Sequence, residues 1–320
     1  MKTKILLTTV STFLILHSAF AQGSLTPPGA PAPTMKTLAQ IEPRTPIAAL
    51  PFNITQPGSY YLTTNLTQAI NGGGIFITSA NVTLDLNGFA LLGANSGTTN
   101  GITLSGSIGN ITVGNGAIAG WGGAGVEGYL LAPNTVNELF EHLTVSGNFS
   151  SGISAGPGSL IRDCLSVGNA AGGGLVGGLS SRGGEIRDCV ARGNSAYGIY
   201  VAPGVVTGCV VQNNVRSGIY VNLPNSVIQQ NTCTGNDAGA FANEAGIYLN
   251  DNSNRIEANY VVTPSSIPGL VSAPGYFNNV VIKNVVSGNG ANNYVGTAGN
   301  DFGPIGTAAT ATSPWANISH

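Results

Sequence analysis

Two matching segments of the chain carry most of the side chains that could act together in chemistry. Arg162-Asp163 and Arg187-Asp188 lie 25 residues apart, and each pair comes directly before a cysteine. If the two segments stack, Asp163 and Asp188 could bind a cation or serve as an acid/base pair. Alternating Arg and Asp side chains on a solvated edge can also neutralise one another, and the sequence favours this structural ion pairing.

A weaker catalytic candidate, Glu141-His142, precedes this patch by about one repeat. Without the first 21 residues the chain has two histidines, His142 and His320. So few histidines argue against a His-based metal site and against a Ser-His-Asp triad. We therefore expect no metal site and no cofactor.

Three tyrosines form the most distinctive candidate for ligand binding. Tyr200, Tyr220 and Tyr248 each follow a Gly-Ile dipeptide and precede Val or Leu. In a strand, alternate side chains point to opposite sides, so all three rings should point outward as one strip. Exposed aromatic rings with polar tips suit sugar binding. The alternative is that the loop over residues 264–278, or the C-terminal tail, covers the rings as a minor core.

A repeat runs through the chain and must position these side chains. A Gly-(Ile/Val/Leu) dipeptide returns every 20 to 28 residues, and a second set of positions, which follows the dipeptides, returns with the same period. Two sets of positions with one period indicate one unit copied about nine times. The unit is too short for a βαβ crossover, so we predict an all-β parallel solenoid of about nine coils, with three short strands per coil and three parallel sheets. The dipeptides begin at Gly74, Gly101, Gly125, Gly152, Gly174, Gly198, Gly218, Gly246 and Gly269.

The second column marks an inward corner between the second and third strands of each coil. An inward Asn at a tight bend can bond to the backbone of the coils above and below. A further asparagine column five residues later, such as Asn148 and Asn169, predicts turns. The corner column contains Asn87, Asn115, Leu143, Cys164, Cys189, Cys209, Asn231, Asn259 and Asn284.

The four cysteines are predicted to be free and buried. Cys164, Cys189 and Cys209 share the corner column, where a small apolar side chain can replace Asn. Cys233 lies two residues beyond its corner at Asn231, which breaks any regular pairing scheme. One disulfide between neighbouring coils remains the alternative.

The ends of the chain differ from the repeat. Lys2 and Lys4 precede an apolar run, and Ala19-Phe20-Ala21 provides a cleavage site, so we predict a signal peptide over residues 1–21. The protein is therefore expected to be secreted, to the cell exterior, the periplasm or the cell surface. After cleavage we expect no membrane insertion. Residues 22–51 are a Pro-rich linker or N-terminal cap, residues 52–300 the solenoid, and residues 301–320 a C-terminal cap or tail. Without the signal peptide, nine basic residues face thirteen acidic ones, which argues against a nucleic-acid partner.

The repeat resembles the right-handed parallel β-helix proteins of the pectate-lyase-like superfamily, in particular their secreted bacterial members. This resemblance implies a right-handed solenoid and export, but no single reaction, because the fold hosts lyases, hydrolases, esterases and adhesins. The match covers roughly residues 52–300, and the segments that carry it are 54–62, 82–88, 111–116, 161–164 and 186–189.

The same resemblance implies that a substrate would lie across the outer face of the strand that follows each Gly. Lyases of this kind need clustered Asp for Ca²⁺ and a basic residue, and hydrolases need paired carboxylates. Neither set is present on that face, where Glu127 alone is ionisable. The outward column there is Phe76, Thr103, Glu127, Ser154, Val176, Tyr200, Tyr220, Tyr248 and Val271.

These observations favour a secreted protein that binds an extracellular polysaccharide or a cell-surface structure without catalysis. The first alternative is a carbohydrate-active enzyme, a polysaccharide lyase before a glycoside hydrolase. The second alternative is a structural spacer that binds no ligand.

Overall fold

The computed structural model describes residues 42–69, 72–129, 135–172, 177–237, 239, 241, 243–288 and 292–320. From Arg44 onward they belong to one compact unit that ends at His320. The described residues form strands and turns without an α-helix, and none of them belongs to a helix that could cross a membrane. The predicted signal peptide and most of the Pro-rich segment lie outside the described residues.

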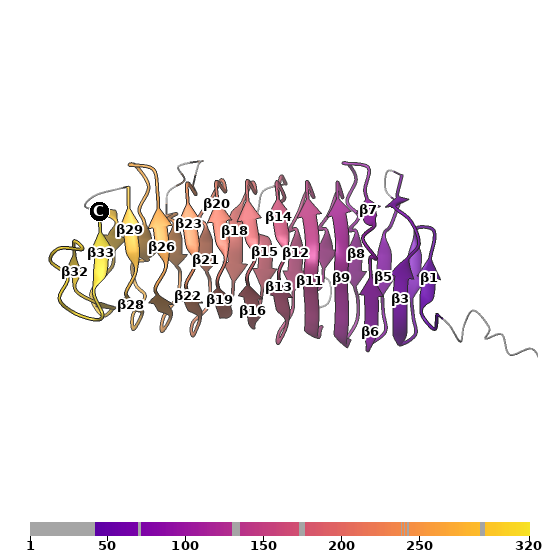
Figure 1. Ribbon diagram of the computed structural model, residues 1–320, viewed down its shortest axis with the longest axis horizontal. Coiled ribbons are helices and arrows are strands. Elements are labelled where there is room, and N and C mark those ends of the chain that lie inside the picture. The colour runs from indigo at the N-terminus through magenta and orange to yellow at the C-terminus, as the bar shows by residue number, and fades with distance from the viewer. Residues whose placement is uncertain are drawn as a thin grey trace, which may run out of the picture. The chain divides into compact units, whose positions relative to one another are not determined.

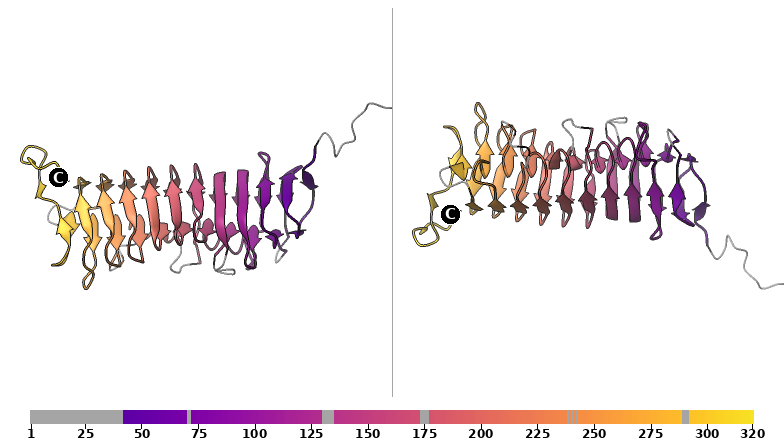
Figure 2. Two further views of the ribbon diagram at one scale, coloured as in Figure 1. Left: turned by 90° about the horizontal axis from the view of Figure 1, so that it is seen from below. Right: turned by 90° about the horizontal axis from the view of Figure 1, so that it is seen from above.

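Each coil contributes three short strands, and every strand pairs in parallel with its equivalents in the neighbouring coils. In one coil these are β18 (Tyr197–Val201), β19 (Gly204–Thr207) and β20 (Val210–Gln212). Gly198 is needed where this coil turns, because a Cβ there would lie 2.4 Å from a methyl carbon of Val211. Figures 1 and 2 show the resulting stack, which confirms the predicted all-β parallel solenoid.

The first face follows the Gly-(Ile/Val/Leu) dipeptides. Its strands are β2 (Phe52–Ile54), β5 (Ile75–Ile77), β8 (Ile102–Leu104), β10 (Val126–Glu127), β12 (Ile153–Ala155), β15 (Gly177–Ser181), β18, β21 (Ile219–Val221), β24 (Ile247–Leu249), β27 (Leu270–Ser272) and β30 (Tyr294–Val295).

The second and third faces join at the corner column. The second face contains β1 (Thr45–Ile47), β3 (Gly58–Leu62), β6 (Val82–Asp85), β13 (Leu160–Arg162), β16 (Gly184–Arg187), β19, β22 (Val227–Gln229), β25 (Arg255–Glu257), β28 (Val280–Ile282) and β31 (Asp301–Phe302). The third face contains β4 (Leu66–Thr67), β7 (Ala90–Leu92), β14 (Leu165–Val167), β17 (Val190–Arg192), β20, β23 (Thr232–Thr234), β26 (Tyr260–Val262), β29 (Val285–Ser287), β32 (Ile305–Gly306) and β33 (Asn317–Ser319). Two long strands, β9 (Gly109–Ala119) and β11 (Val136–Ser146), bend around the corner and belong to both faces.

The coils agree with the sequence repeat except in the fifth. There Ile153 pairs with Leu179, so the equivalent dipeptide is Gly178-Leu179. The predicted Gly174-Leu175 lies outside the described residues. At the two ends β2 and β30 each add a strand to the first face without such a dipeptide.

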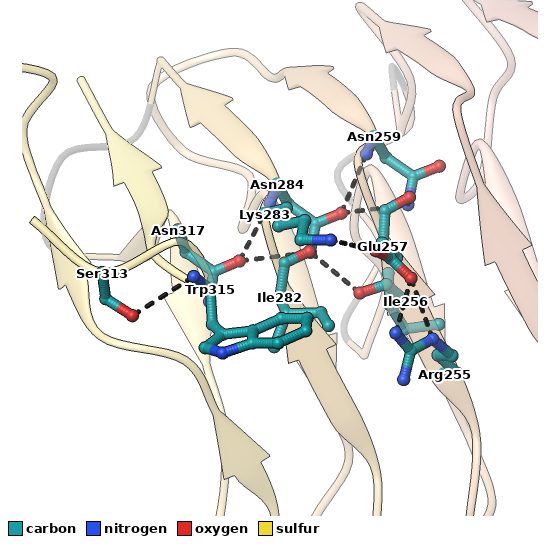
Figure 3. Close-up of polar contacts among 10 residues, drawn as sticks. All are labelled: Arg255, Ile256, Glu257, Asn259, Ile282, Lys283, Asn284, Ser313, Trp315 and Asn317. Atoms are coloured by element: carbon teal, nitrogen blue, oxygen red, sulfur yellow. Dashed lines mark hydrogen bonds and ion pairs between the residues drawn. The ribbon is translucent and has the colours of Figure 1, made fainter. Parts of the chain in front are cut away.

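The corner column is a buried ladder of amides in its C-terminal half. The Oδ1 of Asn231 accepts from the Cys209 amide at 2.9 Å, and its Nδ2 donates to Asn259 Oδ1 at 3.0 Å. The same pattern continues through Asn284 to Asn317, as Figure 3 shows. Each side chain therefore satisfies peptide groups that the bend would otherwise strand.

The predicted ladder is wrong at Asn87 and Asn115. Both side chains are exposed, and both residues have a positive φ, of 54° and 61°. Asn115 lies one position before Gly116, which pairs with Leu143 in the inward column. Asn is common at such turn positions because it tolerates the left-handed conformation, which is a different reason from an inward ladder.

The four cysteines are free, as the sequence favoured, and all are buried. Cys164, Cys189 and Cys209 occupy successive corner positions, and the Sγ of Cys189 points at the carbonyl oxygen of Ile161 in the previous coil, 3.7 Å away. Hydrogen bonding to Cys189 and burial raise the pKa of Cys164, and burial raises the pKa of Cys233. These thiols are therefore inert packing groups.

The second asparagine column is more than a series of turns. From Asn148 to Asn236 the side chains are buried, and those of Asn148, Asn169, Asn194 and Asn214 each donate through Nδ2 to the Oδ1 of the next coil, for example Asn194 to Asn214 at 2.9 Å and Asn214 to Asn236 at 2.8 Å. The backbone amide of each of these residues donates to the same oxygen. This ladder supports the bend between the third face and the next coil.

Both ends of the solenoid are extended by paired strands. β1 pairs with β3, so residues assigned to the cap from sequence add a strand to the second face. At the C-terminal end β33 pairs with β29, and Phe302 of β31 packs against the core. Trp315 stays half exposed beneath Lys283, whose Nζ lies 4.6 Å from the ring centre (Figure 3).

Candidate functional site

The outward column of the first face is continuous in the structure. Tyr200, Tyr220 and Tyr248 pair in register through β18, β21 and β24. In the fifth coil the column contains Ser180, which pairs with Tyr200, in place of the predicted Val176. Val176 lies outside the described residues.

The tyrosine rings stack on one another because the rungs bring them together. The centres of Tyr200 and Tyr220 are 5.9 Å apart and their planes differ by 10°; Tyr220 and Tyr248 are 5.5 Å apart and differ by 7°. Tyr197, which the sequence analysis did not single out, stacks on Tyr220 at 4.4 Å. A ring in such a stack has its faces covered by its neighbours, so its edge and its hydroxyl group remain for a ligand.

The strip is less exposed than the sequence suggests. Tyr200 is 4% exposed and Tyr248 is 5% exposed, while Tyr220 is half-buried. Tyr248 packs with Val271, Ala273 and the half-buried Tyr276, from the segment that the sequence offered as a cover. Most of the tyrosine column is thus covered by other side chains, and a narrow polar edge of it stays open.

The phenol groups of this column stay protonated at neutral pH. Burial raises the pKa of Tyr220 to about 12, and burial also raises the pKa of Tyr200 and of Tyr248. The Nδ2 of Asn222 donates to the Tyr200 hydroxyl at 2.6 Å. Each hydroxyl is therefore a neutral hydrogen-bonding group.

A cleft of about 600 Å³ opens beside Tyr248. Its walls are mostly apolar, with two carboxyl groups among them. The lining residues come from β24 and the segment before it, from β27 and the segments on either side of it, and from β30: Asp237, Phe241, Asn243, Glu244, Tyr248, Ser266, Ile267, Pro268, Val271, Pro274 and Val295.

The two carboxyl groups of the cleft have different surroundings. Glu244 is buried, and its Oε1 accepts from Arg216 Nη1 at 2.9 Å while its Oε2 accepts from the amide and hydroxyl of Ser217. Asp237 is 1% exposed, and its Oδ1 accepts from the Phe241 amide at 3.1 Å. Within the described part of the chain, Asp237 Oδ2 has no hydrogen-bond partner. Burial raises the pKa of Asp237 to about 6, and the nearby Glu244 acts in the same direction.

This pair was not apparent from the sequence repeat. Asp237 and Glu244 lie in the longest interval between two dipeptides, from Gly218 to Gly246, where extra residues form an insertion ahead of β24. The length of that interval was the feature of the sequence that could have indicated an insertion. The repeat says nothing about an insertion, because its residues have no equivalents in other coils.

The six charged candidates from the sequence lie elsewhere, at the corner between the second and third faces. Glu141, Arg162 and Arg187 form one column, and the next column contains His142, Asp163 and Asp188.

These charges are paired on a solvated edge. Arg162 forms an ion pair with Glu141, and Arg187 lies 3.8 Å from both Glu185 and Asp188. Asp163 and Asp188 are exposed and adopt the left-handed turn conformation. Among the described residues no group of three or more His, Cys, Asp or Glu is arranged to hold a metal ion.

Solved structures with similar coils show which fold this is. The A-module of the mannuronan C-5 epimerase AlgE4 from Azotobacter vinelandii superposes with a TM-score of 0.53 at 12% identity, over 87% of this chain and 90% of that one. The fold is that of the right-handed parallel β-helix proteins. Pectate lyase Pel9A is a more distant match, with a TM-score of 0.47 at 14% identity over 82% of this chain and 74% of that chain. No protein-family model and no curated protein matches the sequence.

Proposed function

We propose that this protein binds an extracellular polysaccharide along the first face, from the tyrosine column to the cleft, without altering the ligand covalently. The observation that carries the proposal is that Tyr248 belongs both to the tyrosine stack and to the wall of the cleft. An apolar cleft with a few polar groups, continued by a row of hydroxyl groups, suits an extended polar ligand.

The similarity to the AlgE4 module supports a polysaccharide as the ligand, since that protein is named for its action on mannuronan. A secreted location follows from the predicted signal peptide over residues 1–21. The near balance of charge favours neither nucleic acid nor an anionic membrane as the partner.

The charged candidates from the sequence give no support for catalysis on the first face, and the two carboxyl groups of the cleft, Asp237 and Glu244, enter this proposal as binding groups. Arg162 and Arg187 are paired with neighbouring carboxylates at a corner, away from the tyrosine column on β18, β21 and β24. A general acid or base must lie within hydrogen-bond reach of the bound substrate. Arg162 and Arg187 lie at the corner between the second and third faces, so they do not meet this condition for a substrate on the first face.

The test is a glycan array probed with the mature chain from Gln22, followed by affinity measurement on the best oligosaccharide. Tyr220→Phe keeps the stack and removes one hydroxyl, so we expect several-fold weaker binding; Tyr220→Ala should weaken binding further. Tyr260→Ala is the matched control, because Tyr260 is 47% exposed on the third face, and it should bind as the unmodified protein does.

Three results would overturn this proposal. Retention of no glycan would favour a structural spacer, and unchanged affinity in both Tyr220 variants would remove the tyrosine column from the site. Release of reducing sugar or of unsaturated uronate would show an enzyme.

A further inference from the structure

The unpartnered oxygen of Asp237 is the most informative polar atom of the cleft. Its side chain is almost completely buried, lines the cleft, and uses only Oδ1 in a hydrogen bond to the protein. A buried carboxylate oxygen without a donor is costly to keep, so such atoms point to a partner that arrives with a ligand.

The charge of the cleft is not balanced by the residues that line it. Arg216 lies beside Glu244 and forms an ion pair with it. The described residues that line the cleft include no Lys or Arg. Arg216, which is not part of this lining, acts to lower the pKa of Asp237 but is already paired with Glu244. The cleft therefore repels an anionic sugar and attracts a cationic one.

An ammonium group on a sugar fits these surroundings better than a metal ion or a hydroxyl group. The described residues offer no set of three metal ligands here. A sugar hydroxyl could donate to Asp237 Oδ2 but would leave its charge in place, whereas an ammonium group donates and also neutralises. The apolar walls from Ile267, Pro268 and Val271 can cover the carbon skeleton of the sugar ring.

We propose that the cleft selects polysaccharides that carry free amino groups, with Asp237 as the counter-ion of the ammonium group. This inference rests on the proposed function, because it names the class of sugar that the same site takes. It assigns to Asp237 a specificity role that is separate from the hydroxyl contacts of the tyrosine column.

The experiment compares three soluble hexasaccharides by calorimetry: β-1,4-linked glucosamine, its fully N-acetylated form, and oligogalacturonate. We expect the free amine to bind most tightly and the uronate least. In Asp237→Asn the affinity for the glucosamine hexamer should fall roughly tenfold or more, the size of a lost charge-assisted bond, while affinity for the N-acetylated form should change little. Asp188→Asn is the control, since it removes one carboxylate from an exposed corner and should change neither affinity.

The outcomes separate this inference from the proposed function. Binding of any hexamer without preference for the amine, or without dependence on Asp237, overturns the inference and leaves polysaccharide binding in place. Tighter binding of the uronate overturns it as well. If none of the three hexamers binds, the inference fails, and the glycan array then decides the proposed function separately. A thermal unfolding curve for Asp237→Asn shows that a loss of affinity is not a loss of fold.

Discussion

The corner ladder and the cleft both bury polar side chains, but they differ in whether those side chains are satisfied. At the corner, Asn231 and Asn259 use their oxygen and nitrogen atoms in bonds to the coils on both sides. In the cleft, Asp237 leaves one oxygen without a donor among the described residues. A fully satisfied buried group is explained by the fold alone, while an unsatisfied one needs another explanation, which at a cleft can be a ligand.

The largest expected effect is at the ladder. Asn231→Leu leaves the Cys209 amide without its acceptor in a buried bend, which should lower the free energy of unfolding by roughly 1–3 kcal/mol. Urea unfolding measures the loss. Cys189→Ala, in the same column, should cost about 1 kcal/mol through a small cavity. Equal and negligible losses in the two variants would contradict a structural role for the ladder.

Asp237→Asn should have the opposite effect on stability, and the effect should depend on pH. The native pKa of Asp237, about 6, is above the ordinary value of 3.8, so folding disfavours the ionised form. This cost is absent below about pH 4 and complete above about pH 6. The variant should therefore gain stability relative to the unmodified protein as pH rises from 4 to 7, in the absence of ligand. A difference that is constant with pH would mean that folding does not change the pKa of Asp237 and would contradict this prediction.

A smaller effect is expected at Glu257, which lies between two cations (Figure 3). Hydrogen bonds from Lys283, at 2.8 Å, and from Arg255 lower the pKa of Glu257. Because the pKa of Glu257 is lower in the folded protein, its ionised carboxylate stabilises the fold at pH values above the ordinary pKa of 4.5. This stabilisation is lost as the pH falls through the pKa that Glu257 has in the folded protein. Glu257→Gln should thus lower the melting temperature slightly at pH 7, and the difference should disappear in acid. Glu185→Gln is the control, because its partner Arg187 is 3.8 Å away and both side chains are exposed.

The smallest effects belong to the charged corner that looks most reactive in the sequence. Arg187→Gln and Asp163→Asn should each change the free energy of unfolding by less than about 0.5 kcal/mol, since both side chains are solvated. Neither substitution should alter the affinity for oligosaccharides. A large loss of affinity in either variant would place the binding site at this corner and would contradict a binding site in the cleft.

Most of the fold could be predicted from the sequence because each coil repeats the same local rules. The alternation of Ile199, Tyr200 and Val201 already indicates which side chains point inward. The errors occurred where local rules allow two registers. Asn115 lies one position before the inward residue and Asn87 one position after the buried Leu86, because Asn suits both an inward ladder and a left-handed turn. The fifth coil has two candidate Gly-Leu dipeptides.

The site was less predictable than the fold. The tyrosine column was found from the repeat, but its stacking and burial depend on Tyr197, Val271 and Ala273, which no local pattern connects with it. Asp237 and Glu244 belong to an insertion, so their meeting in one cleft could not be read from the period.

The sequence by itself determined the strand period and most positions of the inward and outward columns of this protein, and it favoured free cysteines, since these follow from alternation and spacing within one coil. Only the tertiary structure decided which rings are exposed and that Asp237, in the cleft, keeps one oxygen without a donor among the described residues. Those properties depend on distances between side chains from different coils and insertions, and burial is set by the atoms that surround a group in space.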